Sequence, residues 1–396
     1  MCFADNFTDI FIDMIQNQLA LPGTIIVTPD PREHEEDFHI LLVNEFNKYP
    51  KMKPCDAVKL VFQGLFGGGH LIKDWFYCLE RIENEGSELT AEQYMYPEIE
   101  RISEEYSRMN LSVLTRLPYD VVGKMFMKSS EAEEKTPEKK EAFLFSLQMI
   151  KDMSEKGESP FTYKEAAEYI DAYIDEVNKT GEPFAPHHSK EYVEAYRPAY
   201  RVVKNVYCDN LEIFVKLSRL YSSGNFSSCA IDGMTASGKT KLAELISDIF
   251  QCNVFHTEDF RLPPVMRTKT AMHGLKSDFD IDRFKSEIVD HLQDTESFSW
   301  GIYNPDKGKY DKRKAVAPER LNIVEGLYSM HPKLGKYYDL GIYVDSDDVV
   351  QARILSSKYG AEGYRQFAEA SMVKEKKYLD ENNIRVSADI VIDCVE

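Results

Sequence analysis

Apolar side chains recur at helical spacing along the first 200 residues. Near the N-terminus, Phe7, Ile10, Phe11, Met14 and Ile15 follow the 3.6-residue period of a helix. Alternating β-branched residues, which are typical of strands, are scarce in this half. The pattern predicts a mainly α-helical domain over residues 1–203, with helices near 7–19, 57–66, 72–82, 140–153 and 164–177.

The pattern changes after Asn210. One more amphipathic helix is predicted over 211–221, and short apolar runs then alternate with helical segments. Such alternation is typical of a parallel sheet that helices cover on both faces. The sequence therefore predicts an α/β domain over residues 204–396, with strands at 228–231, 253–256, 321–324, 340–344 and 388–392 and helices at 239–250, 281–292, 349–358 and 373–381.

Composition narrows the class of protein. The chain has 396 residues, a formal net charge of -19 and 43% hydrophobic residues, so we expect folded domains with an acidic surface. An acidic surface repels phosphodiester backbones, which disfavours nucleic-acid binding. The seven cysteines form no Cys-x-x-Cys pair, and no segment is apolar enough to span a bilayer. We expect a cytoplasmic protein without a nucleic-acid or membrane partner, and a homo-oligomer stays open.

A phosphate-binding loop of the Walker A type follows the first predicted strand of the α/β domain. It matches G-x-x-x-x-G-K-[ST] in full and lies between an apolar strand and a helix. Glycines let the backbone curl so that its N–H groups point inward, and the helix N-terminus adds positive potential. We expect Lys239 to reach the β- and γ-phosphates of ATP and the Thr240 hydroxyl to ligate Mg²⁺. The predicted nucleotide-binding residues are Gly233, Met234, Thr235, Ala236, Ser237, Gly238, Lys239 and Thr240.

Acidic residues follow two other predicted strands. Glu258 and Asp259 come just after the run 253–256, and Glu325 comes directly after the run 321–324. Ligands of open parallel sheets lie outside the carboxyl ends of the strands, where all three residues fall. Phosphoryl transfer needs carboxylates there to hold Mg²⁺ and to orient or deprotonate the acceptor. We therefore predict Glu325 as a metal ligand and Glu258 or Asp259 as the base.

Residues 227–393 resemble the uridine kinase and phosphoribulokinase group of P-loop kinases. The resemblance is carried by IDGMTASGKT at 231–240, FHTEDF at 255–260, IVEGLY at 323–328, YDLGIYVD at 338–345 and ADIVID at 388–393. It implies a small-molecule kinase that phosphorylates a hydroxyl at the expense of ATP with Mg²⁺.

The same resemblance implies roles for individual residues. Glu258 takes the position of the catalytic acid, and Glu325 takes that of the acid near Mg²⁺. Asp278 resembles the residue that holds sugar hydroxyls, and Tyr303 resembles the aromatic near the acceptor. Arg353 resembles a lid arginine that faces the phosphates.

The sequence leaves alternatives open at this point. The family has aspartate where this chain has Glu258, so Asp259 is the alternative base. No histidine follows Tyr303, where a uridine kinase has one, so the acceptor is a nucleoside or another sugar-like molecule. The alternative function is a nucleotide-dependent regulatory protein whose helical domain binds a partner.

Two further motifs lie in the helical half. We interpret the glycines of Gly67-Gly-Gly-His70 as a turn between helices, and His187 and His188 as structural histidines near a helix N-terminus. Together they are the candidates for a second site, whose chemistry no motif names.

Overall fold

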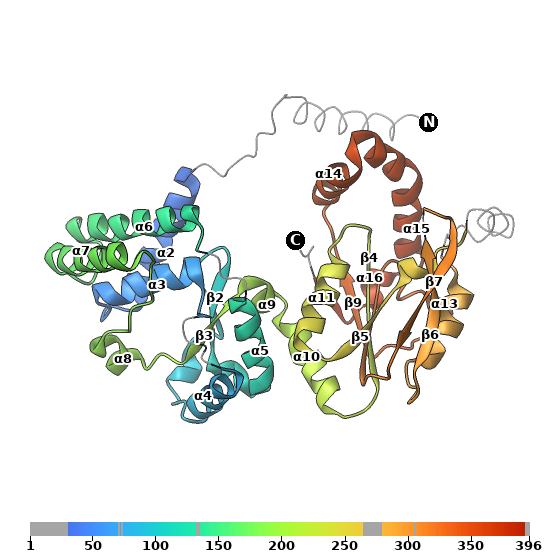
Figure 1. Ribbon diagram of the computed structural model, residues 1–396, viewed down its shortest axis with the longest axis horizontal. Coiled ribbons are helices and arrows are strands. Elements are labelled where there is room, and N and C mark those ends of the chain that lie inside the picture. The colour runs from blue at the N-terminus through green and yellow to red at the C-terminus, as the bar shows by residue number, and fades with distance from the viewer. Residues whose placement is uncertain are drawn as a thin grey trace. The chain divides into compact units, whose positions relative to one another are not determined.

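The chain forms two compact units, each assembled from three chain segments. The computed structural model describes residues 31–69, 72, 74–131, 135–263, 279–304 and 306–392. Unit 1 comprises Met1–Leu71, Thr90–Asn110 and Ala132–Val202, and unit 2 comprises Ile72–Leu89, Leu111–Glu131 and Val203–Glu396. Figure 1 shows the helices and the sheet of each unit. In the part of the chain that is described, no helix is long and apolar enough to cross a membrane.

Unit 1 is mainly helical, with a small sheet. The sheet has the order β1-β2-β3, from Ile99–Arg101, Tyr106–Asn110 and Tyr200–Lys204. Buried aromatic and aliphatic side chains of the helices form the core, including Phe62, Phe143 and Tyr173. The sequence predicts the helical character but not the sheet. The helices are α2 (Pro31–Lys48), α3 (Pro54–Phe66), α6 (Pro137–Glu155), α7 (Tyr163–Thr180) and α8 (Lys190–Tyr196), with a 3₁₀ turn at Gln93–Met95.

The sequence explains where these helices begin and end. Before α7, the Thr162 hydroxyl accepts from Glu165 N–H while the Glu165 carboxylate accepts from Thr162 N–H, which is a capping box. The helix ends at Gly181, whose left-handed backbone has a φ of 83°. Helix α6 begins at Pro137, directly after its N-cap residue Thr136, three residues before the start that the sequence predicts. The predicted helix at 7–19 lies outside the described residues.

Unit 2 is built on a five-stranded parallel sheet. The strand order is β10-β9-β4-β8-β5, from Ile390–Ile392, Leu340–Val344, Ser227–Gly233, Leu321–Glu325 and Cys252–His256. These are the five apolar runs that the sequence predicts as strands, so the predicted α/β sheet is confirmed. Helices of unit 2 are α4 (Trp75–Ser87), α5 (Tyr119–Ser130), α9 (Asn205–Asp209), α10 (Leu211–Ser222), α11 (Lys239–Ile249), α13 (Ile281–Glu287), α14 (Asp348–Phe367), α15 (Val373–Glu381) and α16 (Ile384–Ser387).

Short 3₁₀ and π turns connect these elements. The 3₁₀ turns lie at Leu111–Thr115, Thr257–Phe260, Val289–His291 and Pro332–Leu334, and a π turn at Ala368–Met372 joins α14 to α15. A separate antiparallel hairpin, β6 (Phe298–Asn304) with β7 (Lys309–Val316), was not predicted. Its first strand carries Trp300, a fully buried residue of the unit 2 core.

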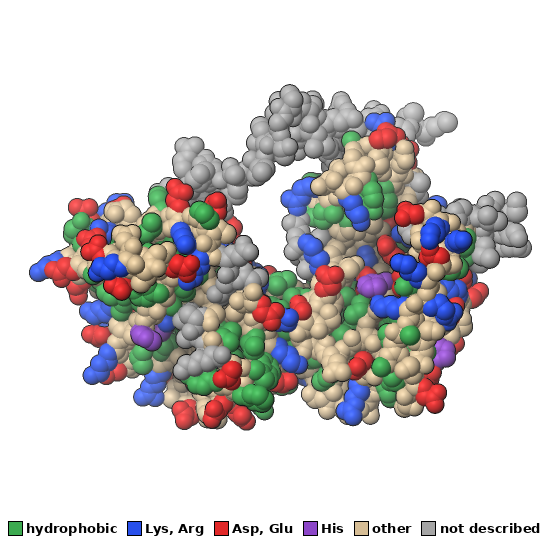
Figure 2. All heavy atoms as spheres, viewed as in Figure 1, with side chains coloured by type: hydrophobic (Ala, Val, Ile, Leu, Met, Phe, Trp, Pro, Cys, Tyr) green, Lys and Arg blue, Asp and Glu red, His purple; other side chains and the backbone are tan. Residues whose placement is uncertain are grey.

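Two segments from the first half of the chain belong to unit 2. Helix α5 packs on α11, where Lys124 Nζ donates to the Ile249 carbonyl at 2.8 Å and Lys128 lies 3.4 Å from Asp248. The chain therefore passes between the two units several times. The last boundary between them lies between Val202 and Val203. Figure 2 shows acidic and basic side chains interspersed on the visible face of the molecule.

Candidate active site

The phosphate-binding loop leaves the carboxyl end of β4, the middle strand of the sheet, and enters α11. Gly233 has a φ of 146°, and a Cβ there would overlap the Val344 carbonyl oxygen on β9. Gly238 has a φ of 94° at the start of α11. Both conformations favour glycine, so the two fixed glycines of the motif are required by this backbone. Ala236, between them, also has a positive φ of 64°.

Lys239 lies inside this loop. Its side chain is only 7% exposed, and Nζ donates to the Met234 carbonyl at 2.5 Å and to Ser237 Oγ at 3.4 Å. The ammonium group is therefore held over the loop by the loop's own oxygens. A phosphate oxygen is a stronger acceptor than these neutral groups, so a bound phosphate can exchange for them.

Thr240 is linked to the acid at the end of the next strand. Its hydroxyl donates to Glu325 Oε1 at 3.2 Å, and His256 Nδ1 lies 2.5 Å from the same oxygen. The strand register explains this meeting, because Glu325 pairs with Ile231 on β4 and with His256 on β5. The hydrogen bond that His256 donates to the Glu325 carboxylate raises the pKa of His256, although burial opposes it. The predicted pair Thr240 and Glu325 is therefore brought together, with His256 beside it.

The backbone after Glu325 also constrains this corner. Gly326 has a φ of 127°, and a Cβ there would overlap Thr257 Oγ1 at the end of β5. Glycine is thus required for β8 and the turn after β5 to approach this closely. The Val-Glu-Gly motif places a carboxylate and a close backbone contact at successive positions.

The Asp232 carboxylate fixes the start of the phosphate-binding loop through hydrogen bonds. It is fully buried, and its carboxylate accepts from Gly233 N–H at 2.8 Å, Met330 N–H at 2.9 Å and the Tyr378 hydroxyl at 2.7 Å. Burial raises the pKa of Asp232, and these donors oppose the rise. A buried carboxylate with three donors holds the turn in one conformation.

Two helices after β9 hold the opposite side of the loop. Glu375 on α15 accepts from Thr235 N–H at 2.9 Å and from the Thr235 hydroxyl at 2.7 Å. Gln351 on α14 donates to the Thr235 carbonyl at 2.7 Å. The sequence analysis identified neither residue. The polar groups of Thr235 are thus bonded to the two helices.

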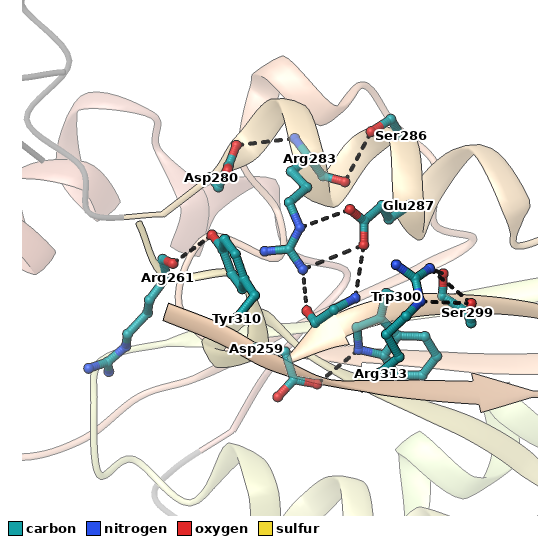
Figure 3. A network of polar contacts seen from close by, with 11 residues as sticks. Asp259, Arg261, Asp280, Arg283, Ser286, Glu287, Ser299, Trp300, Tyr310 and Arg313 are labelled. Carbon is teal, nitrogen blue, oxygen red and sulfur yellow. Dashed lines mark hydrogen bonds and ion pairs between the residues drawn. The ribbon is translucent and has the colours of Figure 1, made fainter. Parts of the chain in front are cut away.

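The two adjacent acids after β5 have different surroundings. The Glu258 side chain is 70% exposed and pairs only with Arg261 at 3.2 Å among the interactions described. Asp259 is half-buried, and its Oδ2 accepts from the Trp300 indole N–H at 3.0 Å. Figure 3 shows the Trp300 ring presenting this N–H to the carboxylate. The charge of Asp259 also contributes to the raised pKa of His256.

The hairpin and α13 form a wall beside Asp259 (Figure 3). The Arg283 guanidinium stacks between the rings of Phe260 and Tyr310, with Cζ 4.3 and 3.9 Å from the two centroids. It also binds the Glu287 carboxylate at 2.9 Å and the Gly301 carbonyl. This wall fixes β6, and with it the Trp300 donor, against the acid after β5.

The remaining predicted residues are placed as follows. Tyr303 lies on β6, 7% exposed, with its ring 5.9 Å from that of Tyr310. Arg353 is exposed on α14, two positions after Gln351, which bonds to the loop. Asp278 lies outside the described residues. Tyr303 is thus on the wall next to Asp259, whereas Arg353 is on the helix next to Thr235.

Four residues of the site were missed by the sequence analysis: His256, Asp232, Glu375 and Gln351. His256 and Asp232 carried a usable signal, since each is a polar residue at the carboxyl end of an apolar strand. Glu375 and Gln351 carried none, because they lie on polar helices where such residues are ordinarily solvated.

Known proteins similar to this chain are found among solved structures. No family model matches the chain, and no curated protein matches it either. One similar solved structure is a possible uridine kinase from Bacillus stearothermophilus, 17% identical, with a TM-score of 0.36 over 46% of this chain and 100% of that one. Another is a candidate fructose transport system kinase from Silicibacter sp. TM1040, 17% identical, with a TM-score of 0.35 over 42% and 89%.

The strand order and the loop geometry decide the fold. The sheet is parallel, and the phosphate-binding loop follows its middle strand. Acidic residues follow the next two strands in the sheet, β8 and β5. The C-terminal half therefore has a parallel α/β fold with a phosphate-binding loop of the Walker A type after its middle strand. The parallel sheet and the phosphate-binding loop that the sequence predicts are confirmed, and the substrate is a separate question.

Proposed function

We propose that unit 2 transfers the γ-phosphate of ATP to a hydroxyl of a nucleoside or another small sugar-like acceptor. The observation that carries the proposal is the contact between the Thr240 hydroxyl and Glu325, directly after Lys239, whose ammonium lies on the loop. Each group suits one need of phosphoryl transfer: an ammonium for the phosphates, oxygens for a metal and a carboxylate for the acceptor.

The oxygen donors at this corner fit Mg²⁺. Thr240 and Glu325 present a hydroxyl and a carboxylate 3.2 Å apart, and Mg²⁺ prefers such ligands together with water and phosphate oxygens. When bound, Mg²⁺ neutralises charge that develops on the phosphates. No cluster of three or more histidine, cysteine or acidic ligands occurs among the described residues, so phosphate and water would complete the shell.

Asp259 is the group we assign to the acceptor. Its carboxylate is fixed by the Trp300 N–H, whereas Glu258 extends into solvent. In the proposed reaction the acceptor oxygen bonds to the γ-phosphorus, and the bond from that phosphorus to the β-phosphate oxygen breaks. The hydroxyl proton passes to Asp259, and ADP leaves. Lys239 stays on the phosphates throughout, since its ammonium stabilises the developing charge.

The test is release of ADP from ATP with Mg²⁺ against a panel of nucleosides, sugars and polyols. Stimulation by one class of compound supports the proposal and names the acceptor. The Lys239→Ala variant serves as the blank, and we expect it to lose transfer while keeping its far-UV circular dichroism. Turnover by that variant equal to the parent would contradict the assignment of the loop.

One observation favours a second function, a nucleotide-dependent switch. The bonds from Glu375 and Gln351 to Thr235 connect the loop to α15 and α14. A nucleotide that changes the conformation of Thr235 would shift those helices and could signal to a partner. Tight nucleotide binding without stimulation by any acceptor would support this second function instead.

A further inference from the structure

A group of polar side chains lies buried in unit 1, around the phenol of Tyr200. The Tyr200 hydroxyl lies 3.1 Å from Gln63 Oε1 and 2.9 Å from His188 Nε2. The Arg108 guanidinium lies over the Tyr200 ring, with Cζ 5.0 Å from the centroid. We refer to Asp56, Lys59, Gln63, Arg108, His188 and Tyr200 as the Tyr200 cluster.

Four parts of unit 1 supply the cluster. Asp56, Lys59 and Gln63 lie on α3 at spacings of three and four residues, which places them on one face of that helix. Arg108 comes from β2 and Tyr200 from β3. The segment before α8 brings His188, one of the two histidines that the sequence analysis interpreted as structural. Because residues far apart in sequence converge here, no local motif could reveal the cluster.

The Asp56 side of the cluster has complete hydrogen bonding. Its carboxylate is 2.9 Å from His188 Nδ1 and accepts from Lys53 N–H, Ser189 N–H and the Ser189 hydroxyl at 2.9, 2.9 and 2.5 Å. These hydrogen bonds lower the pKa of Asp56 against the effect of burial. His188 in this way has a fixed orientation, with one nitrogen on Asp56 and the other on Tyr200.

The Arg108 side is incomplete. Arg108 is 1% exposed, and Nη1 donates to Glu45 Oε2 at 2.8 Å, but Nε and Nη2 have no acceptor in the described part of the chain. These two N–H groups leave the planar guanidinium on the same edge, which matches the two oxygens of a carboxylate or phosphate. Leaving buried donors of a charged group unpaired is costly, so a native fold rarely does so without a reason.

Two further donors belong to the cluster. The Gln63 amide uses one atom for Tyr200, and its nitrogen is buried without a partner among the described residues. The Lys59 ammonium has three N–H groups and donates to the Pro186 carbonyl at 2.9 Å. Burial and then the nearby charge of Arg108 lower the pKa of Lys59 to about 8. The cluster thus holds two cations and a spare amide.

We propose that the Tyr200 cluster binds a small oxyanion, the carboxylate or phosphate group of a small molecule, on the Nε–Nη2 edge of Arg108. Glu45 and Asp56 already supply two negative charges against Arg108 and Lys59. A singly charged carboxylate therefore suits the cluster better than a doubly charged phosphate. This site belongs to unit 1 and does not depend on the function proposed for unit 2.

The test is calorimetric titration of the full chain with acetate and with inorganic phosphate. Both titrations use the Lys239→Ala background, because the loop of unit 2 also attracts phosphate. We expect acetate to bind with a Kd of about 1 mM, which is weaker than the ceiling for a ligand of so few atoms. Arg108→Lys keeps a positive charge opposite Glu45 but removes the bidentate pair of N–H donors on Nε and Nη2. This variant should weaken anion binding about tenfold or more.

The control is Arg81→Lys, an exposed arginine that pairs with Glu85 and should leave the affinity unchanged. Should Arg108→Lys not fold, Gln63→Leu retains Arg108 and is expected to weaken binding severalfold. Stronger binding of phosphate than of acetate would support the site and assign a phosphorylated ligand to it. The proposal is wrong if neither anion binds to the parent, or if Arg108→Lys and Gln63→Leu both bind as the parent does.

Discussion

The carboxylate of Glu375 accepts from both the backbone N–H and the hydroxyl of Thr235, at 2.9 and 2.7 Å. Thr235 is the third residue of the phosphate-binding loop, so a buried negative charge lies beside the loop that, in the proposed function, receives a triphosphate. This charge stabilises the loop and at the same time opposes a nearby anion.

We therefore predict that Glu375→Gln tightens ATP binding. The amide keeps an acceptor oxygen for Thr235 but removes the charge, and we expect the Kd to fall about fivefold, ~1 kcal/mol. Fluorescence titration with a labelled ATP analogue measures this. The control is Glu381→Gln on the same helix, where Glu381 is exposed and pairs with Lys377. Weaker binding by Glu375→Gln would mean that its charge serves the loop more than it opposes the nucleotide.

The two acids after β5 should differ in their effect on catalysis. The resemblance assigns the larger role to Glu258, but the structure buries part of Asp259 and fixes it with Trp300. We predict that Asp259→Asn lowers kcat about 100-fold or more, since general-base catalysis contributes about that much, and that Glu258→Gln changes it less than threefold. Steady-state assays with the best acceptor measure both. The reverse order of losses would return the role to Glu258.

Gly326 should be intolerant of any side chain. An added Cβ would overlap Thr257 Oγ1, and the φ of 127° is strained for other residues. We expect Gly326→Ala to lower the free energy of unfolding by about 3 kcal/mol or more. Gly335→Ala is the matched variant, because Gly335 also has a positive φ, of 74°, but open space around it. For Gly335→Ala we expect the free energy of unfolding to fall by about 1–2 kcal/mol, from backbone strain alone. Urea denaturation measures the loss for both variants.

Unit 1 should lose stability in mild acid because of His188. Burial, and the charges of Lys59 and Arg108, lower the pKa of His188 from its ordinary value of 6.5, although Asp56 opposes this. The unfolded chain therefore takes up this proton first, and stability falls as the pH drops below about 6.5. The lowered pKa of Asp56 acts in a separate window, below its ordinary 3.8.

We predict that His188→Gln flattens this dependence between pH 7.5 and 5.5. The variant lacks the titrating ring, so it should lose less stability over that range than the parent does. Urea denaturation followed by circular dichroism at the two values gives the comparison. Equal losses in parent and variant would show that other groups bind the proton.

The fold of unit 2 could be predicted because the three central strands of its sheet, β4, β8 and β9, are buried along their whole length. The five strands are short apolar runs, and the loop between β4 and α11 is fixed by glycine geometry that leaves a clear sequence pattern. Acids at strand ends followed from the same topology. The hairpin β6–β7 was missed, because β7 is largely exposed and charged and has no apolar alternation to signal a strand.

The rest of the site depends on long-range contacts. Glu375 lies 140 positions after Thr235, and the Tyr200 cluster joins residues 56 and 188. In a sequence, a single polar residue on a helix is typical of solvated surface, and only the fold shows which residues its side chain contacts. For the same reason the resemblance favoured Glu258 over Asp259, since only the packing of Trp300 distinguishes the two adjacent acids.

The interleaving of the two units has a consequence for how the protein is made. Helices α4 and α5 are synthesised long before the strand β4 and the helix α11, on which α5 packs. During translation α5 therefore precedes its packing partner, and the sheet of unit 2 is complete only after β10 has been synthesised. A single cut of the chain cannot separate the two units, because each contains three segments that alternate along the sequence.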